Sequence, residues 1–102
     1  MTIILDPTEN EIQALFNLAR GFTGQSVLEV GCGNGRLTWR YANQASQVIG
    51  IDPKEERIRQ AQADTPAELK DRVAFLALGL EDFYKRSSQV PAFDRVLFSW
   101  SL

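Results

Sequence analysis

The fold of this chain is decided by the stretch Ser26-Val27-Leu28-Glu29-Val30-Gly31-Cys32-Gly33-Asn34-Gly35-Arg36-Leu37-Thr38. It opens as a short apolar run, which is typical of a buried parallel strand. Glycine then stands at every second position, where the backbone turns tightly and a ligand can approach with no Cβ in the way. After the last glycine the apolar spacing suits a helix. Strand, glycine turn and helix in this order make the first half of a βαβ nucleotide-binding unit.

The glycine spacing separates two classes of nucleotide-binding protein. A dinucleotide fingerprint, G-x-G-x-x-G, needs its third glycine where this chain has Arg36, so that fingerprint fails. The sequence has Glu29-x-Gly31-x-Gly33-x-Gly35 instead. Together with its flanks from Val27 to Thr38, this pattern resembles the glycine-rich motif of class I S-adenosylmethionine-dependent methyltransferases. In that family an acidic residue usually stands two places before the first glycine.

Length and composition restrict the possible functions. At 102 residues the chain is at most one small domain, and its net charge of −2 gives no basic field for nucleic acid or an anionic membrane. It has no histidine, which excludes a Ser-His or Cys-His nucleophile pair and removes the commonest metal ligand. We therefore expect no metal site, and because no run approaches about 18 apolar residues we also expect no membrane span. The single cysteine, Cys32, excludes an internal disulfide and favours a reducing, cytoplasmic compartment.

Periodicity and turn signals predict the remaining elements along the chain. Met1 to Leu5 is interpreted as an apolar arm, and apolar residues at helical spacing predict a helix over 8–20. The further elements that we expect are strands at 26–30, 47–51, 73–78 and 95–101, helices at 35–44 and 53–63, a turn at 67–70, and a helix ending near Arg86.

The resemblance to the methyltransferase family covers residues 26–102 and implies a fold. It implies an α/β, Rossmann-like, three-layer αβα domain whose parallel strands are ordered 3-2-1-4. The family's sheet has seven strands in the order 3-2-1-4-5-7-6, so we expect residues 1–102 to be a single cofactor-binding domain that is truncated after the fourth strand. Without a fifth strand, the edge from Arg95 to Ser101 is expected to face water or to drive self-association. Such a chain alone would show little methyl transfer.

An acidic residue closes the second expected strand. Asp52 lies about twenty residues beyond the first glycine, where nucleotide-binding units place the acid that holds a ribose. A carboxylate can accept hydrogen bonds from two adjacent ribose hydroxyls. The alternative is that Asp52 caps the next helix, because Pro53 follows it and Glu55 and Glu56 suit a first helical turn.

The residues after the third expected strand depart from the family pattern. The family commonly has Asp directly after the third strand and its glycine, whereas Leu80 stands there in this chain and Glu81 and Asp82 follow. In the family this acid often meets the exocyclic amine of adenine, so the resemblance gives that contact to the displaced acids and ring packing to Leu80. The alternative is that Glu81 and Asp82 only begin the helix that ends near Arg86.

The resemblance assigns S-adenosylmethionine as the cofactor and gives roles to individual residues. The three glycines shape the turn around the methionine end, Glu29 accepts from the cofactor's ammonium group directly or through water, and Cys32 presents its backbone. Ser99, with Trp100, lies where the cleft opens towards an acceptor. The predicted cofactor-binding residues are Glu29, Gly31, Cys32, Gly33, Gly35, Asp52, Pro53, Leu80, Glu81 and Ser99.

The function that follows is methyl transfer. The sulfonium of the cofactor is already activated, so the protein's task is positioning, and no catalytic triad is required. No catalytic residue is identified from the sequence, and the methyl acceptor is not readable, with a preference for a small molecule. Two alternatives stay open: a non-catalytic binding or assembly piece of the same fold, and an NAD-binding module, which Arg36 disfavours.

Overall fold

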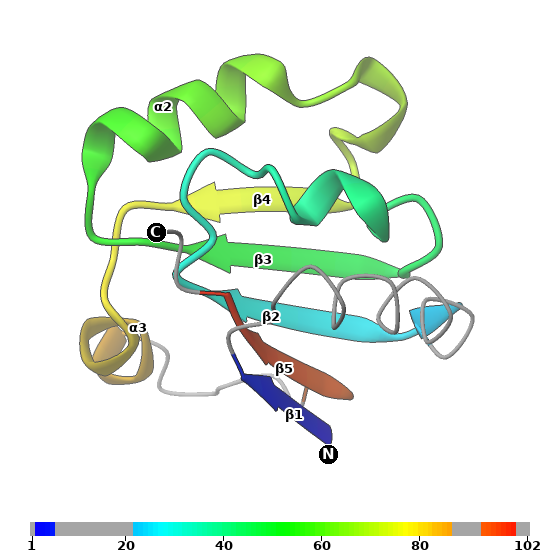
Figure 1. Cartoon of the computed structure of the whole chain (residues 1–102), viewed down its shortest axis with the longest axis horizontal. Coiled ribbons are helices and arrows are strands. Elements are labelled where there is room, and N and C mark those ends of the chain that lie inside the picture. The colour runs from blue at the N-terminus through cyan, green and yellow to red at the C-terminus, as the bar shows by residue number, and fades with distance from the viewer. Residues whose placement is uncertain (1, 6–21, 87–92, 100–102) are drawn as a thin grey trace.

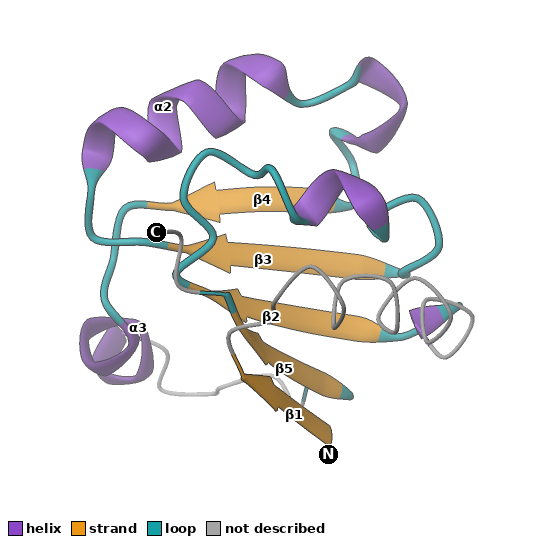
Figure 2. Cartoon of the chain, in the orientation of Figure 1, coloured by secondary structure: helices purple, strands orange, loops and turns teal. Residues whose placement is uncertain are grey.

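The computed structural model of the chain describes residues 2–5, 22–86 and 93–99, with side chains from residue 22 onward. Its described part holds one parallel sheet with helices on both sides (Figures 1 and 2). The elements are β1 (Thr2–Leu5), β2 (Ser26–Val30), η2 (Thr38–Arg40), β3 (Gln47–Ile51), α2 (Glu55–Asp64), η3 (Ala67–Leu69), β4 (Val73–Leu76), α3 (Leu80–Arg86) and β5 (Arg95–Phe98).

The predicted strand order is confirmed. The sheet has the order β1-β5-β2-β3-β4, so the four strands expected from the sequence lie as 3-2-1-4 with a further strand at one edge. Each neighbouring pair is parallel. The third expected strand ends at Leu76 rather than at residue 78, and the strand expected over 95–101 ends at Phe98.

The edge of β5 is not free, so that expectation was wrong. The segment interpreted as an apolar arm is strand β1, which pairs with β5 from Thr2↔Arg95 to Leu5↔Phe98 (Figure 1). An extended segment satisfies its own backbone groups and those of the strand edge by adding to the ladder. The self-association predicted through this edge loses its basis along the paired residues. The helix predicted over 8–20, and Trp100 and Ser101, lie outside the described residues.

Alternating side chains divide the core between the two faces of the sheet. Val27, Val48 and Leu97 face the cluster that α2 covers, to which α2 contributes Ile58 and Ala61. The opposite cluster is covered by α3 and is formed by Leu28, Val30, Ile51, Phe83, Phe93 and Val96. The chain therefore has the three layers predicted from its sequence.

The helix predicted over 35–44 is replaced by turns and the short 3-10 helix η2. Backbone hydrogen bonds of two kinds occur there. Trp39 N donates to Gly35 O, four residues back, whereas Tyr41 N donates to Thr38 O, three residues back. In a 3-10 helix, side chains three residues apart are eclipsed. This geometry directs Thr38 and Tyr41 the same way, and both hydroxyls reach the same carboxylate in β2.

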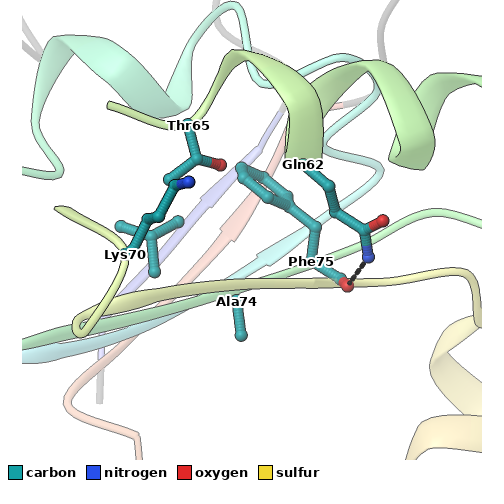
Figure 3. Close-up of a pocket in the computed structure, with 6 residues that line it drawn as sticks. Gln62, Thr65, Lys70, Ala74 and Phe75 are labelled. Carbon is teal, nitrogen blue, oxygen red and sulfur yellow. Dashed lines mark hydrogen bonds between the residues drawn. The ribbon is translucent and has the colours of Figure 1, made fainter. Parts of the chain in front are cut away.

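The outer strand β4 lies beside α2 and η3. Gln62 Nε2 donates to Phe75 O at 2.9 Å, so a side chain of α2 covers part of the strand's edge (Figure 3). A shallow pocket next to this contact is lined by Gln62, Thr65, Lys70, Val73, Ala74 and Phe75. Helix α2 itself begins at Glu55, two residues after the predicted start.

Gly50 of β3 gives a test of core packing. A Cβ there would lie 2.8 Å from Phe75 Cδ1 and 3.0 Å from Cys32 Sγ, so Gly50→Ala overpacks the core. We expect its free energy of unfolding to fall by about 1–3 kcal/mol, measured by urea denaturation.

Gly79→Ala is the matched control for Gly50→Ala. No heavy atom lies within 4 Å of a Cβ at Gly79, so the change in its free energy of unfolding should stay within about 0.5 kcal/mol. Equal stabilities for the two variants would contradict the packing seen around Gly50.

Candidate functional site

The glycine turn lies at the carboxyl end of β2, tied to the neighbouring strand. The backbone N–H groups of Gly31 and Cys32 both donate to Ile51 O, at 2.8 and 3.1 Å. Gly31, Gly33 and Gly35 have φ angles of 77°, 59° and 86°. These are left-handed conformations that side chains with a Cβ rarely adopt. Three glycines are therefore required by the backbone of the turn, at the edge of the sheet where open α/β folds bind their ligands.

Asp52 connects this turn to the start of α2. It is 5% exposed; its Oδ2 accepts from Gly33 N at 3.1 Å and its Oδ1 from Lys54 N at 2.9 Å. The N-cap of α2 is Lys54, without a capping side chain, so Asp52 does not cap the helix in the way that the alternative interpretation required. A carboxylate has about four lone-pair sites, and two are left for a ligand. Pro53 follows as an exposed residue.

Glu29 is fully buried in the middle of the sheet and accepts three hydroxyl hydrogen bonds. Its Oε1 accepts from Thr38 Oγ1 at 2.8 Å and from Tyr41 Oη at 2.5 Å. Its Oε2 accepts from Ser99 Oγ at 2.5 Å. The donors come from η2, from the turn after it and from the residue that follows β5. One carboxylate thus joins three separate segments around the glycine turn.

Burial dominates the electrostatics of this cluster. It raises the pKa of Glu29 above its ordinary value of 4.5, against the lowering effect of the hydrogen bonds from Ser99, Tyr41 and Thr38. Burial, with the nearby charges of Glu29 and Asp52, raises the pKa of the Cys32 thiol. Cys32 is 4% exposed, so it stays a protonated thiol and is not placed as a nucleophile.

Sequence reasoning missed how three residues support the turn. The apolar spacing of the predicted 35–44 helix accounts for the packing of Tyr41 and Trp39 against one face of the sheet, which the structure shows, but it gave no sign of their contacts to the turn or of any role for Thr38. Thr38 and Tyr41 hold Glu29, whereas Trp39 packs against Gly35, since a Cβ there would lie 3.0 Å from Trp39 Cζ2. Two hydroxyls three residues apart, after a strand that contains an acid, were the available signal.

The residues expected near an adenine stand at the start of α3. Leu80 is half-buried and packs against the apolar cluster under α3. Glu81 is exposed, and its Oε1 lies 3.2 Å from Lys85 Nζ, one helical turn on. The acids after Gly79 therefore do begin a helix.

The described residues bear on two absences that were expected from the sequence, a metal site and a membrane span. Within residues 22–86 and 93–99 no three His, Cys, Asp or Glu side chains gather as a metal site. In the same part of the chain no helix is long and apolar enough to cross a membrane.

Comparisons with known proteins agree on one family. A family model described as a methyltransferase domain matches residues 27–102. The ubiquinone biosynthesis O-methyltransferase of Bos taurus mitochondria is 37% identical over 79 residues, which are 76% of this chain and 21% of that protein. The tRNA U34 carboxymethyltransferase of Methylococcus capsulatus is 43% identical over 74 residues, 72% of this chain and 22% of that protein. The chain thus spans about a fifth of the length of these relatives.

Solved structures share the fold. Precorrin 8w decarboxylase of Methanobacterium thermoautotrophicum has a TM-score of 0.71 at 22% identity, over 93% of this chain and 50% of that one. The magnesium protoporphyrin IX methyltransferase of Synechocystis, solved with bound S-adenosylmethionine, has a TM-score of 0.66 at 20% identity, over 87% of this chain and 42% of that one.

The buried carboxylate predicts a pH dependence of stability. Because the pKa of Glu29 is raised on folding, the folded chain binds this proton more readily than the unfolded chain. Its contribution to stability is therefore greatest below about pH 4.5 and is lost as the pH rises through the folded pKa. Glu29→Gln lacks this titration, so the parent should lose free energy of unfolding relative to the variant as the pH rises, measured by urea denaturation at several pH values.

Glu55→Gln is the control, since the side chain of Glu55 is 74% exposed and its pair with Arg59 contributes little. A difference between parent and Glu29→Gln that is the same at every pH would contradict the assignment.

Proposed function

Since the chain belongs to the class I S-adenosylmethionine-dependent methyltransferases, we propose that it binds that cofactor at the glycine turn and serves methyl transfer to a small-molecule acceptor. The observation that carries the proposal is the bond from Gly33 N to Asp52 Oδ2. It places a buried carboxylate with spare lone pairs beside a turn of left-handed glycines. This is the pairing that a ribose and its flanking groups need.

The ribose is assigned to Asp52. Each of its oxygens already accepts one backbone N–H, which fixes the plane of the carboxylate. The remaining lone pairs accept from two neighbouring ribose hydroxyls without any change of rotamer. Pro53, exposed beside it, borders the same sugar in this proposal.

The methionine end is assigned to the turn between Gly31 and Gly35. Gly31, Cys32 and Gly33 present backbone to it, Glu29 supplies negative charge for its ammonium group, and Ser99 supplies a hydroxyl that can accept from that group. When bound, the cofactor's sulfonium supplies a methyl carbon that is ready for nucleophilic substitution. The chain's own contribution is then orientation of the cofactor and a suitable field.

The adenine is assigned to Leu80. It is half-buried at the start of α3 and presents apolar surface, whereas the neighbouring Glu81 pairs with Lys85. An apolar side chain recognises the flat ring by burial of surface, and backbone groups nearby supply polarity.

A small molecule is the proposed acceptor class. The net charge of −2 gives no field for a polyanion, and one relative is named for ubiquinone biosynthesis. Another relative is named for tRNA U34, so nucleic acid is the competing class. Transfer of labelled methyl to a hydroxylated aromatic compound, but not to tRNA, would support the proposal; labelled tRNA alone would contradict it.

A reducing, cytoplasmic location is proposed together with this function, because Cys32 is a buried thiol.

Cofactor choice is tested by calorimetric titration with S-adenosylmethionine, S-adenosylhomocysteine and NAD. We expect saturable binding of the first two and none of NAD. The opposite preference would overturn the assignment.

Asp52→Ala tests the ribose contact. We expect it to weaken S-adenosylhomocysteine binding by about 1.5–3 kcal/mol, the range for hydrogen bonds to a charged group, measured by calorimetry. Asp94→Ala is the matched control, because Asp94 Oδ2 also accepts a backbone N–H, from Ser26 at 2.9 Å, but at the opposite end of β2. Equal losses in the two folded variants would reject the role.

A further inference from the structure

The contacts of Glu29 differ between its two oxygens. Oε1 accepts two hydroxyls, from Thr38 and Tyr41, which fills the two lone pairs of a carboxylate oxygen. Oε2 accepts one hydroxyl, from Ser99. The carboxylate is therefore anchored through one oxygen and keeps its remaining acceptor capacity on the other.

Ser99 lies between this second oxygen and the glycine turn. Its Oγ is 2.5 Å from Glu29 Oε2 and 3.4 Å from Gly31 O. Ser99 is 8% exposed, whereas Glu29 has no exposure at all. A hydroxyl has a single hydrogen, and when that hydrogen goes to Oε2 the oxygen lone pairs of Ser99 are left to accept from a ligand.

A primary ammonium group matches this arrangement chemically. It carries three donors, no acceptor and a positive charge. Ser99 Oγ and Gly31 O are acceptors that lie close together, and the charge behind them is that of Glu29. Hydrogen bonds in a chain polarise one another, so a hydroxyl that donates to a carboxylate becomes a better acceptor.

We propose that Thr38 and Tyr41 are positioning residues which hold the Glu29 carboxylate, so that its charge acts on a bound ammonium group through the Ser99 hydroxyl. The proposal rests on the proposed function, because that ammonium is the one of the cofactor's amino-acid end. It differs from the expectation that Glu29 itself, or a water molecule, meets the ammonium.

Two ligands separate this role from a general effect on the fold. S-adenosylhomocysteine has the ammonium group, whereas 5′-methylthioadenosine shares the adenosine and lacks the amino-acid end. Tyr41→Phe removes one oxygen and keeps the ring that packs against Phe22 at 5.0 Å. We expect Tyr41→Phe and Thr38→Val each to weaken S-adenosylhomocysteine about five- to tenfold and 5′-methylthioadenosine less than about twofold.

Conservative replacement is the control. Thr38→Ser keeps the hydroxyl and should restore the parent affinity for S-adenosylhomocysteine. Ser99→Ala should weaken S-adenosylhomocysteine in the same selective way as the other two variants.

Each outcome of the titrations decides between defined alternatives. Equal loss of both ligands in Tyr41→Phe and Thr38→Val, or failure of Thr38→Ser to restore binding, would overturn the positioning role. If the parent binds neither ligand, the proposed function itself fails. This result differs from a failure of the positioning role, in which the parent binds but the variants do not show the selective loss.

Discussion

A buried carboxylate needs hydrogen-bond donors from the protein in place of water, and the arrangement of the site depends on meeting this need at Glu29. Desolvation of such a group costs several kcal/mol, and each hydrogen bond to a charged group returns about 1.5–3 kcal/mol. Three hydroxyls supply these bonds, from Thr38, Tyr41 and Ser99. The position of the turn after the glycines and that of the residue after β5 therefore depend on one side chain of β2.

Asp52, which follows strand β3, differs from Glu29 in its hydrogen-bond donors and in its exposure. Its partners are backbone N–H groups of Gly33 and Lys54 rather than hydroxyls, and it retains slight exposure. Parallel neighbours bring the ends of β2 and β3 together, so the two carboxylates flank the same turn. Glu29 lies beneath the turn with its oxygens held by hydroxyls, while Asp52 presents acceptor oxygens beside the turn. In the proposed function these two kinds of group correspond to the cationic end and the ribose of the cofactor.

Local patterns predicted what depends on neighbours in sequence and missed what depends on distant partners. The strands at 26–30 and 47–51 follow from apolar runs, and the place of Asp52 from its spacing to the first glycine. The helix expected over 35–44 is wrong because apolar spacing carries no information about the hydroxyls that reach Glu29. Ser99 lies 70 residues from Glu29, so no window of sequence joins them. Strand β1 is a few apolar residues whose partner, β5, lies at the far end of the described chain.

Register connects the sheet to the chemistry of the site. Leu28 pairs with Val96 and Val30 with Phe98, and these four side chains face the cluster under α3. Leu97 consequently faces the other side, opposite Glu29, and Ser99 follows on that same side two residues later. A slip of one residue would exchange the faces and bring the ring of Phe98 towards the carboxylate in place of a hydroxyl. The apolar pairs that fix β5 between β1 and β2 thus also determine which atom meets Glu29, and the hydrogen bond from Ser99 N to Val30 O, at 2.9 Å, extends this register to the site.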